Sequence, residues 1–276
     1  MPPSEGHARA QTPPAPTSSP LIPANAGTQV VATDAGGDAR AAEVRAALAP
    51  VTDPELDESV VDLGFIARVA VDGDRAEVDF RLPTFWCSAN FAWIMAEDMR
   101  AALARLPWLA RADVRLVDHF AAGRVNAGVA AGQSFRSAFG DEAADDLESI
   151  RETFRQKAYL GRTSRLIEAL REHGWSDDRI LAATVADVRD LGAGQGDAGP
   201  GTAAVASRFL ALRAVYGGSS APGETAFRRL DGTAVTADGL AAWLRDIRMT
   251  RRGVEANGEM CRVLLRARIE DPAPAE

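Results

Sequence analysis

Residues 60–82 decide the fold of this chain, because their sequence, VVDLGFIARVAVDGDRAEVDFRL, predicts two strands joined by a tight turn. The first run, 60–71, is rich in β-branched side chains and ends at the turn signal DGD at 72–74. The second run, 76–82, alternates apolar and charged side chains with a period of two. Together they predict a β-hairpin with one buried face.

The segments on either side of this hairpin predict two helices and a third strand. A helical pattern starts at Asp38, an N-cap candidate, and stops at Pro50. Ser88 is the predicted N-cap of a second helix, which carries an apolar stripe as far as Leu106. Residues 112–117 alternate again and predict a strand. The order helix, strand, strand, helix, strand indicates a small α/β (α+β) sheet with helices on one face.

Composition divides the chain into three parts. Residues 1–37 are rich in Pro, Ala, Ser, Thr and Gly and cannot bury enough apolar surface to offset the entropy of ordering, so we expect a disordered tail. The α/β domain is expected over 38–122. A connector of small residues at 123–132 then leads to a mostly α-helical region over 134–270.

Overall composition excludes several classes of protein. The chain has 276 residues, 46% of them hydrophobic and 25% charged, and a net charge of −8. An acidic chain without a concentrated basic face is not expected to bind nucleic acid. The two cysteines, Cys87 and Cys261, are too few and too far apart for a disulfide framework, which indicates a reducing compartment. We see no basic leader and no apolar run of about 20 residues, so we predict a cytoplasmic protein without a membrane partner.

Cys87 lies between the hairpin and the second predicted helix. The free backbone N–H groups and positive dipole end of a helix favour a thiolate over a thiol. A thiolate binds soft metals or attacks electrophiles. The alternative is a small buried hydrophobic residue, which is the commonest environment of a free cysteine.

A set of motifs surrounds this cysteine: DPE at 53–55, VVDLGFI at 60–66, an alternating strand, and Cys87 at a helix start. In order and spacing these residues resemble the iron-sulfur cluster assembly domain family of SufT-like and PaaD-like metal-sulfur cluster biosynthesis proteins. The resemblance covers about residues 38–120. Trp86 and Ser88 flank the cysteine here, where members of the family commonly have Gly and Pro.

The resemblance implies an accessory factor, not an enzyme, for the assembly of iron-sulfur clusters or iron centres and their insertion into client proteins. By position, Cys87 is the functional thiol that binds iron or a cluster transiently, and Asp53 and Glu55 are the acids of the DPE motif. Asp62 and Gly64 match the VDLG loop, and Asp62 is expected to hydrogen-bond the Cys87 loop from the neighbouring strand. The implied partner is a client metalloprotein, such as a metal-dependent oxygenase, which the helical C-terminal region would recognise.

One cysteine cannot hold a cluster, because clusters are normally bound by about four protein ligands. A homodimer bridging two Cys87 thiolates, a complex with the client, or convergence with Cys261 would each supply more ligands. Cys261 itself is expected to pack in the core of the last helical stretch. Asp53 and Glu55 are candidate hard ligands. We favour the alternative of a turn role for Asp53, whereas for Glu55 a solvated position is an equal alternative. His119, which ends the third predicted strand, is a candidate nitrogen ligand or simply a polar strand end.

Aromatic residues lie near the thiol in sequence: Phe85, Trp86 and Trp93. Such residues are usually core, and the alternative is an apolar shield or a docking patch for a client.

Two rival functions remain open at this level. In a thiol enzyme, Cys87 would be the nucleophile and His119 the base. In a non-catalytic adaptor, the α/β domain would bind a protein partner without metal chemistry.

Overall fold

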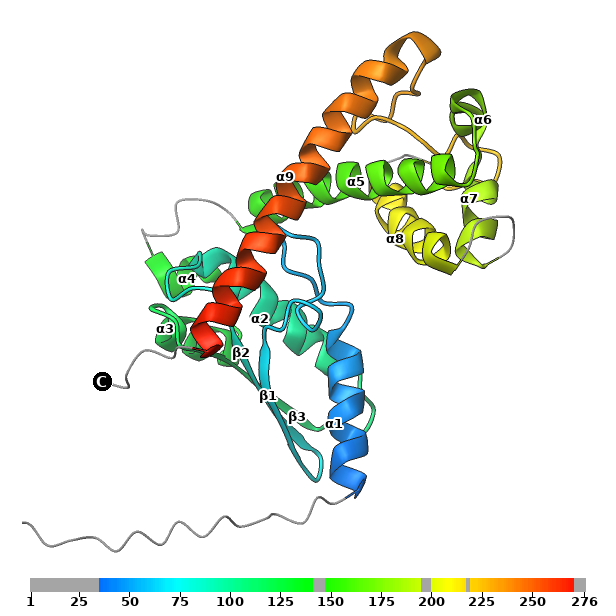
Figure 1. Ribbon diagram of the computed structural model, residues 1–276. Helices are drawn as coiled ribbons and strands as arrows, with labels where there is room; N and C mark the ends of the chain where they lie inside the picture. The colour runs from blue at the N-terminus through cyan, green and yellow to red at the C-terminus, as the bar shows by residue number, and fades with distance from the viewer. Residues whose placement is uncertain (1–34, 141–146, 195–199, 217–218, 271–276) are drawn as a thin grey trace, which may run out of the picture. The chain divides into compact units, whose positions relative to one another are not determined.

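The computed structural model describes residues 35–140, 147–194, 200–216 and 219–270 (Figure 1). Most of the predicted tail therefore lies outside the described residues. The first helix, α1 (Ala35–Leu48), begins three residues before Asp38. Asp38 lies in the first turn of this helix, where its charge suits the helix dipole, and is not the N-cap residue.

A three-stranded sheet forms the centre of the N-terminal half. Strands β1 (Ile66–Asp72) and β2 (Arg75–Arg81) make the predicted antiparallel hairpin, and β3 (Arg111–Val117) pairs with β2 in parallel. The alternation of β2 buries its apolar side chains on the inner face. On the outer face, Asp79 pairs with Arg68 and Arg115 in an exposed ion-pair network. The predicted fold class is confirmed.

The hairpin is shorter than the sequence predicts, because residues 60–64 form a turn and not a strand. Gly64 has a φ of +75°, a conformation that favours glycine, and the Phe65 N–H donates to the Val60 carbonyl over 3.0 Å. The apolar side chains of this turn, among them Leu63, are buried beneath it. These side chains are therefore apolar because they are buried under a turn, and not because they belong to a strand.

Helices cover one face of the sheet, as predicted. Helix α2 (Ala89–Leu103) packs on β3 beside α3 (Ala122–Ala130), and α1 packs on β1. Helix α3 occupies the stretch predicted as a connector, and the short α4 (Phe135–Phe139) follows it. Gly128 of α3 allows the close approach of the Trp93 ring, which accounts for one of the small residues in that stretch.

The C-terminal half is helical, as predicted. Its elements are α5 (Leu147–Glu172), α6 (Asp177–Ala182), α7 (Val185–Gly192), α8 (Pro200–Tyr216) and α9 (Ala237–Glu270). Helix α9 packs on α5 and crosses it, and α5 also packs on α8 (Figure 1). No helix within the described ranges is long and apolar enough to cross a membrane.

Two hydrophobic clusters share α9. The first lies between the sheet and its helices, and the second is formed by α5 to α9. The 34 residues of α9 extend over about 50 Å at 1.5 Å per residue. Its N-terminal part contributes Trp243 and Ile247 to the second cluster, whereas Leu265 near its end is buried in the first. One helix therefore spans from the helical core to the core beneath the sheet.

Candidate functional site

The loop that carries Cys87 joins β2 to α2 at one edge of the sheet. Strands β2 and β3 run parallel, so the loops that follow them leave from the same edge. The Phe120 N–H donates to the Phe85 carbonyl over 3.2 Å and ties the two loops together. Asp118 makes the turn after β3 with a φ of +52°. Backbone contacts thus fix the position of the loop that carries the thiol.

Cys87 lies just before α2, as the sequence predicts, and is half-buried. Its Sγ is 3.2 Å from the hydroxyl oxygen of Thr84, a neighbour that the sequence did not single out. Ser88 is the N-cap residue of α2, but its side chain makes no capping hydrogen bond, so the predicted side-chain cap is wrong. The thiol therefore has one fixed polar neighbour and a helix start that Ser88 leaves uncapped.

His119 holds the Cys87 loop through its ring. Its Nε2 donates to the Cys87 carbonyl over 2.7 Å, and its Nδ1 accepts from the Ala121 N–H at 3.2 Å, which assigns the proton to Nε2. Burial lowers the pKa of His119, and the charge of Arg268 lowers it further, against the opposite effect of the bond to Cys87. His119 is thus a neutral side chain that positions the Cys87 loop. It would have to break one of these two hydrogen bonds to bind a metal or act as a base.

Asp53 organises the DPE loop. One of its carboxylate oxygens accepts from the N–H groups of Glu55 and Leu56, both over 2.9 Å, which is the turn role weighed from the sequence. Burial raises its pKa to about 6, and the charges of Glu55 and Glu58 add to this effect, while the two backbone bonds oppose it. Asp53 is therefore a buried structural carboxyl of the loop.

Of the other motif residues, Glu55 and Gly64 contact α9, whereas Asp62 is exposed. Glu55 accepts a hydrogen bond from Asn257 of α9 at 3.2 Å. Asp62 is exposed in the turn before β1, and its expected hydrogen bond to the Cys87 loop is not found in the described part of the chain. Gly64 makes that turn beneath Leu265, whose Cδ2 lies 3.7 Å from where a Cβ on Gly64 would be.

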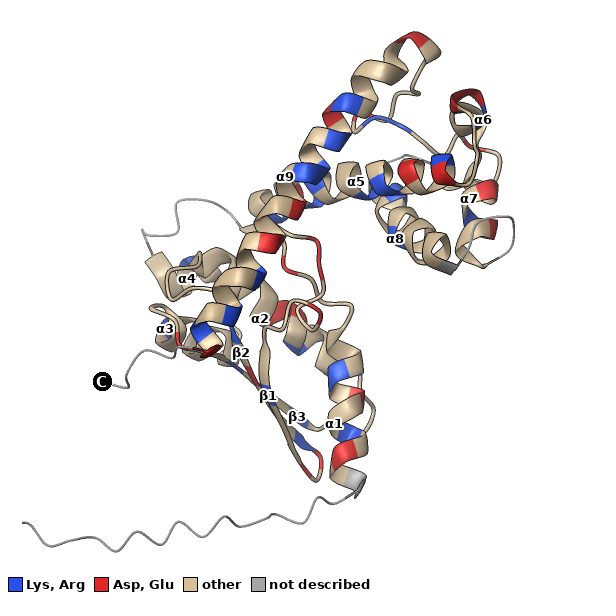
Figure 2. Cartoon of the chain, viewed as in Figure 1, with Lys and Arg blue, Asp and Glu red and all other residues tan. Residues whose placement is uncertain are grey.

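The last turns of α9 cover this edge, which the sequence did not predict. Arg262 pairs with Glu58 at 2.5 Å, and Arg268 donates to the Leu82 carbonyl at 2.8 Å and to the Asp118 carbonyl. Figure 2 shows basic residues along this part of α9 and acidic residues in the loop before β1. Pairs of opposite charge thus help to hold the end of α9 against the loops that carry the DPE and VDLG motifs.

The three aromatic residues near Cys87 in sequence have different environments. Trp93 is a core residue, as expected from the sequence, and packs against Phe135 and Phe139. Phe85 and Trp86 are instead exposed, Trp86 by 77%, and they pack edge to face. Phe120 joins them from the neighbouring loop and is also exposed. The expectation of core burial is wrong for Phe85 and Trp86, because they lie in the loop beyond the end of β2.

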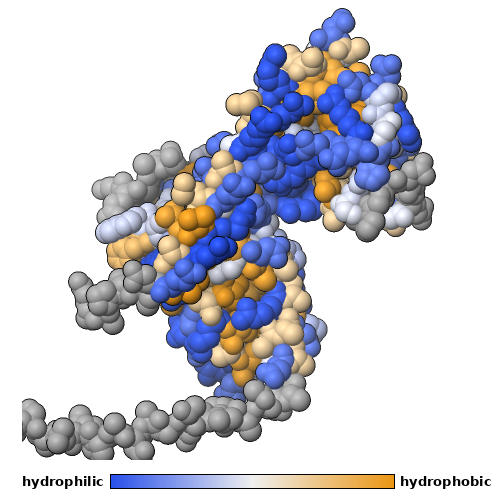
Figure 3. All heavy atoms as spheres, in the orientation of Figure 1, coloured by the Kyte–Doolittle hydropathy of each residue, from blue (hydrophilic) through white to orange (hydrophobic). Residues whose placement is uncertain are grey.

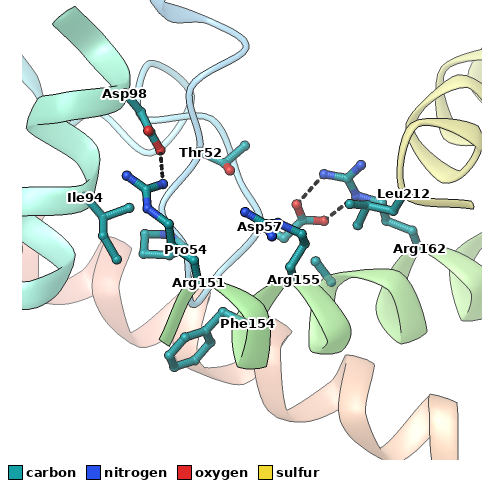
Figure 4. A pocket seen from close by; sticks show the side chains of 11 residues that line it. Thr52, Pro54, Asp57, Ile94, Asp98, Arg151, Phe154, Arg155, Arg162 and Leu212 are labelled. Carbon is teal, nitrogen blue, oxygen red and sulfur yellow. Dashed lines mark hydrogen bonds and ion pairs between the residues drawn. The ribbon is translucent and has the colours of Figure 1, made fainter. Parts of the chain in front are cut away.

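A cavity of about 220 Å³ lies between the DPE loop, α2 and α5 (Figure 4). Three arginines line it, and each is paired with carboxylates. Arg151 pairs with Asp98 at 2.9 Å, and Arg162 makes a two-bond pair with Asp57 at 2.6 and 2.8 Å. Arg155 pairs with Glu148 and Glu152, both at 3.5 Å. Neither cysteine lines the cavity. We therefore interpret the ion pairs of Arg151 and Arg162 as the link between α5, α2 and the DPE loop, and we assign the cavity no ligand.

The predicted site residues do not form a complete metal site. Within the described residues, no three His, Cys, Asp or Glu side chains converge on a position that could hold a metal ion. The structure brings His119 and Cys87 into contact, but through a ring nitrogen and a backbone carbonyl. The ligand roles of Asp53, Glu55 and His119 therefore stay predictions.

Part of the chain matches a known protein family. Residues 41–116 match the family model described as iron-sulfur cluster assembly protein. The matched segment contains the DPE motif, the VDLG loop and Cys87, and confirms the resemblance seen in the sequence for this part of the chain. Comparison with curated proteins found no match. The family match supports a general role in iron-sulfur cluster assembly, and it does not reach α5 to α9.

Proposed function

We propose that this chain is an accessory factor that binds iron or an iron-sulfur cluster transiently through Cys87 and passes it to a client metalloprotein. The observation that carries the proposal is the position of Cys87: a half-buried thiol in the segment that matches the assembly family, held at the sheet edge by His119. Thiolate is the preferred protein ligand of iron-sulfur clusters.

An incomplete ligand set suits a delivery role. A resident cluster takes about four protein ligands, whereas cargo must leave by exchange of its ligands for those of the client. A site with few thiols leaves coordination positions that the client can occupy. The client itself is expected to be a metalloprotein, with a metal-dependent oxygenase as one candidate class.

The exposed aromatic residues supply a surface for such a client. Phe85, Trp86 and Phe120 form a cluster next to Cys87, with ring centroids 4.8 and 6.4 Å apart for the two pairs that include Phe85. Aromatic side chains are enriched at the centres of protein interfaces. A client bound to this cluster would bring its own ligands close to the thiol. The same cluster also suits an adaptor without metal chemistry, whose partner binding would survive loss of the thiol.

A cargo-transfer assay tests the proposal. Wild type, Cys87→Ser and Ser88→Ala would be loaded anaerobically with iron and sulfide and mixed with an apo-ferredoxin of the [2Fe–2S] class, and the circular dichroism of the acceptor's cluster would be followed. Ser88→Ala is the matched control, because the Ser88 side chain makes no capping bond.

We expect transfer from wild type and Ser88→Ala and none above background from Cys87→Ser. Equal transfer from Cys87→Ser would contradict the proposed role of the thiol. A Trp86-dependent complex with a partner that is unaffected by Cys87→Ser, without any transfer, would favour the adaptor.

A further inference from the structure

The second cysteine of the chain lies on the part of α9 that covers the Cys87 edge. Residues Gly258, Cys261, Leu265 and Arg268 recur at intervals of three or four and therefore share one face of the helix. Gly258 and Leu265 are buried, whereas Val263 and Leu264 on the other side are exposed. Figure 3 shows apolar side chains exposed along this half of α9. Cys261 thus lies on the face that α9 turns toward the motif loops.

Contacts on both sides of Cys261 fix that face in place. On the N-terminal side, a Cβ on Gly258 would lie 3.0 Å from Glu58 Oε1, and Asn257 bonds to Glu55. On the C-terminal side, Leu265 packs over Gly64. Arg268 then donates to the carbonyl of Leu82, in the loop that leads to Cys87. Cys261 therefore lies between two sets of contacts, on the face of α9 that packs on the DPE loop and on the start of the loop that leads to Cys87.

The two thiols share one environment. Both are half-buried, and both pack against the hydrophobic cluster beneath the sheet. They are close enough to interact electrostatically: burial raises the pKa of Cys261 to about 11, and the charges of Asp53, Cys87 and Glu55 add to this increase. Cys261 is thus not an isolated core residue of a remote helix.

We propose that Cys261 is a second cargo ligand, and that Cys87 and Cys261 together bind iron as a two-thiolate site that α9 completes. The proposal rests on the proposed function of Cys87. Two thiols bind Fe²⁺ by losing two protons and displacing two water ligands, with no change of oxidation state. The two thiolates fill about half of the usual four positions and leave the rest for thiols of the client.

Whether the Cys87 and Cys261 thiols are close enough to act together can be tested without iron. Phenylarsine oxide condenses with two neighbouring thiols: two As–S bonds form, and the oxygen leaves as water with both thiol protons. The reduced full chain would be treated with one equivalent, alkylated and weighed by mass spectrometry. We expect one bridging arsenic per wild-type chain and none in Cys87→Ser or Cys261→Ser. Val263→Ser, on the exposed side of the same helix, is the control and should behave as wild type.

Anaerobic titration with Fe²⁺ in the presence of glutathione then tests ligation. We expect Cys261→Ser and Cys87→Ser each to weaken binding by about 10-fold or more, with far-UV circular dichroism unchanged. If Cys261→Ser binds iron as wild type does while Cys87→Ser does not, the proposal that Cys261 is a second ligand is refuted, and the proposed function of Cys87 stands. If wild type itself binds no iron, the proposed function fails and the iron role of Cys261 with it. Separate alkylation of both thiols in the presence of the arsenical would overturn the pairing itself.

Discussion

Replacement of Gly128 by alanine tests how tightly α2 and α3 pack beneath the site. Gly128 lies in α3, where a Cβ would be 2.4 and 2.7 Å from two atoms of the Trp93 ring and 3.0 Å from the Cβ of Ala138. Ordinary van der Waals contacts of a Cβ begin at 3.4 Å. Trp93 is fully buried and packs edge to face against Phe135 and Phe139, so the ring has no room to move aside.

Two opposing effects determine how much Gly128→Ala changes the free energy of unfolding. Alanine is favoured over glycine within a helix by about 1 kcal/mol, whereas overpacking a filled core costs about 1–3 kcal/mol. The clash with a rigid ring places this site at the upper end of that range, so we expect Gly128→Ala to lower the free energy of unfolding by about 2 kcal/mol. Gly123→Ala is the matched control in the same helix, because it is exposed with nothing within 4 Å of an added Cβ.

The assay is urea unfolding of both variants, followed by tryptophan fluorescence and far-UV circular dichroism. A second arm repeats Gly128→Ala in a Trp93→Phe background, which removes the part of the ring that the new methyl group meets. We expect the cost of Gly128→Ala to fall by about 1 kcal/mol or more there, since residues in contact are energetically coupled. If Gly128→Ala is as stable as Gly123→Ala, or costs the same in both backgrounds, the argument from packing is wrong.

Three further predictions concern the loops around the site. Folding raises the pKa of Asp53 from 3.8 to about 6, so its protonated form stabilises the fold below about pH 4 and this stabilisation is lost as the pH rises through 6. Asp53→Asn should therefore gain about 2 kcal/mol relative to wild type between pH 4 and pH 7 in urea unfolding, and a constant difference would contradict the shift. Arg162→Ala should cost about 3 kcal/mol, because it leaves Asp57 buried with weaker pairing. Arg115→Ala in the exposed network should cost far less, and equal losses would refute the distinction. Trp86→Ala should change stability by less than about 0.5 kcal/mol yet slow cargo transfer to the acceptor, and unimpaired transfer would exclude a docking role.

Local patterns in the sequence predicted most of the N-terminal half. The alternation of 76–82 has one physical solution, a strand with one buried face, and the turn at 72–74 fixes its partner. The same logic fails for 60–64, where buried apolar side chains surround a turn that depends on the positive φ of Gly64. It fails again for α3, because Gly128 there allows a close approach to Trp93 and does not mark a connector.

Long-range contacts were beyond the reach of sequence patterns. The positions of Cys87 and Asp53 followed from motifs within one domain, but nothing local indicates that the end of α9 packs on the same loops. That contact depends on pairs such as Arg262 with Glu58, which are more than 200 positions apart. Cys261 was accordingly expected to be a core residue of the last helix. The structure shows that the face of α9 that carries Cys261 packs on the motif loops.

The most direct test of the central claim, that Cys87 binds iron cargo, is anaerobic reconstitution of the full chain with iron and sulfide. Visible absorbance and bound iron per chain would be recorded for wild type and for Cys87→Ala, with Ser88→Ala as control. We predict bound iron with sulfide-dependent visible absorbance in wild type and Ser88→Ala, and the loss of both in Cys87→Ala. The same iron content and spectrum in Cys87→Ala would contradict the account.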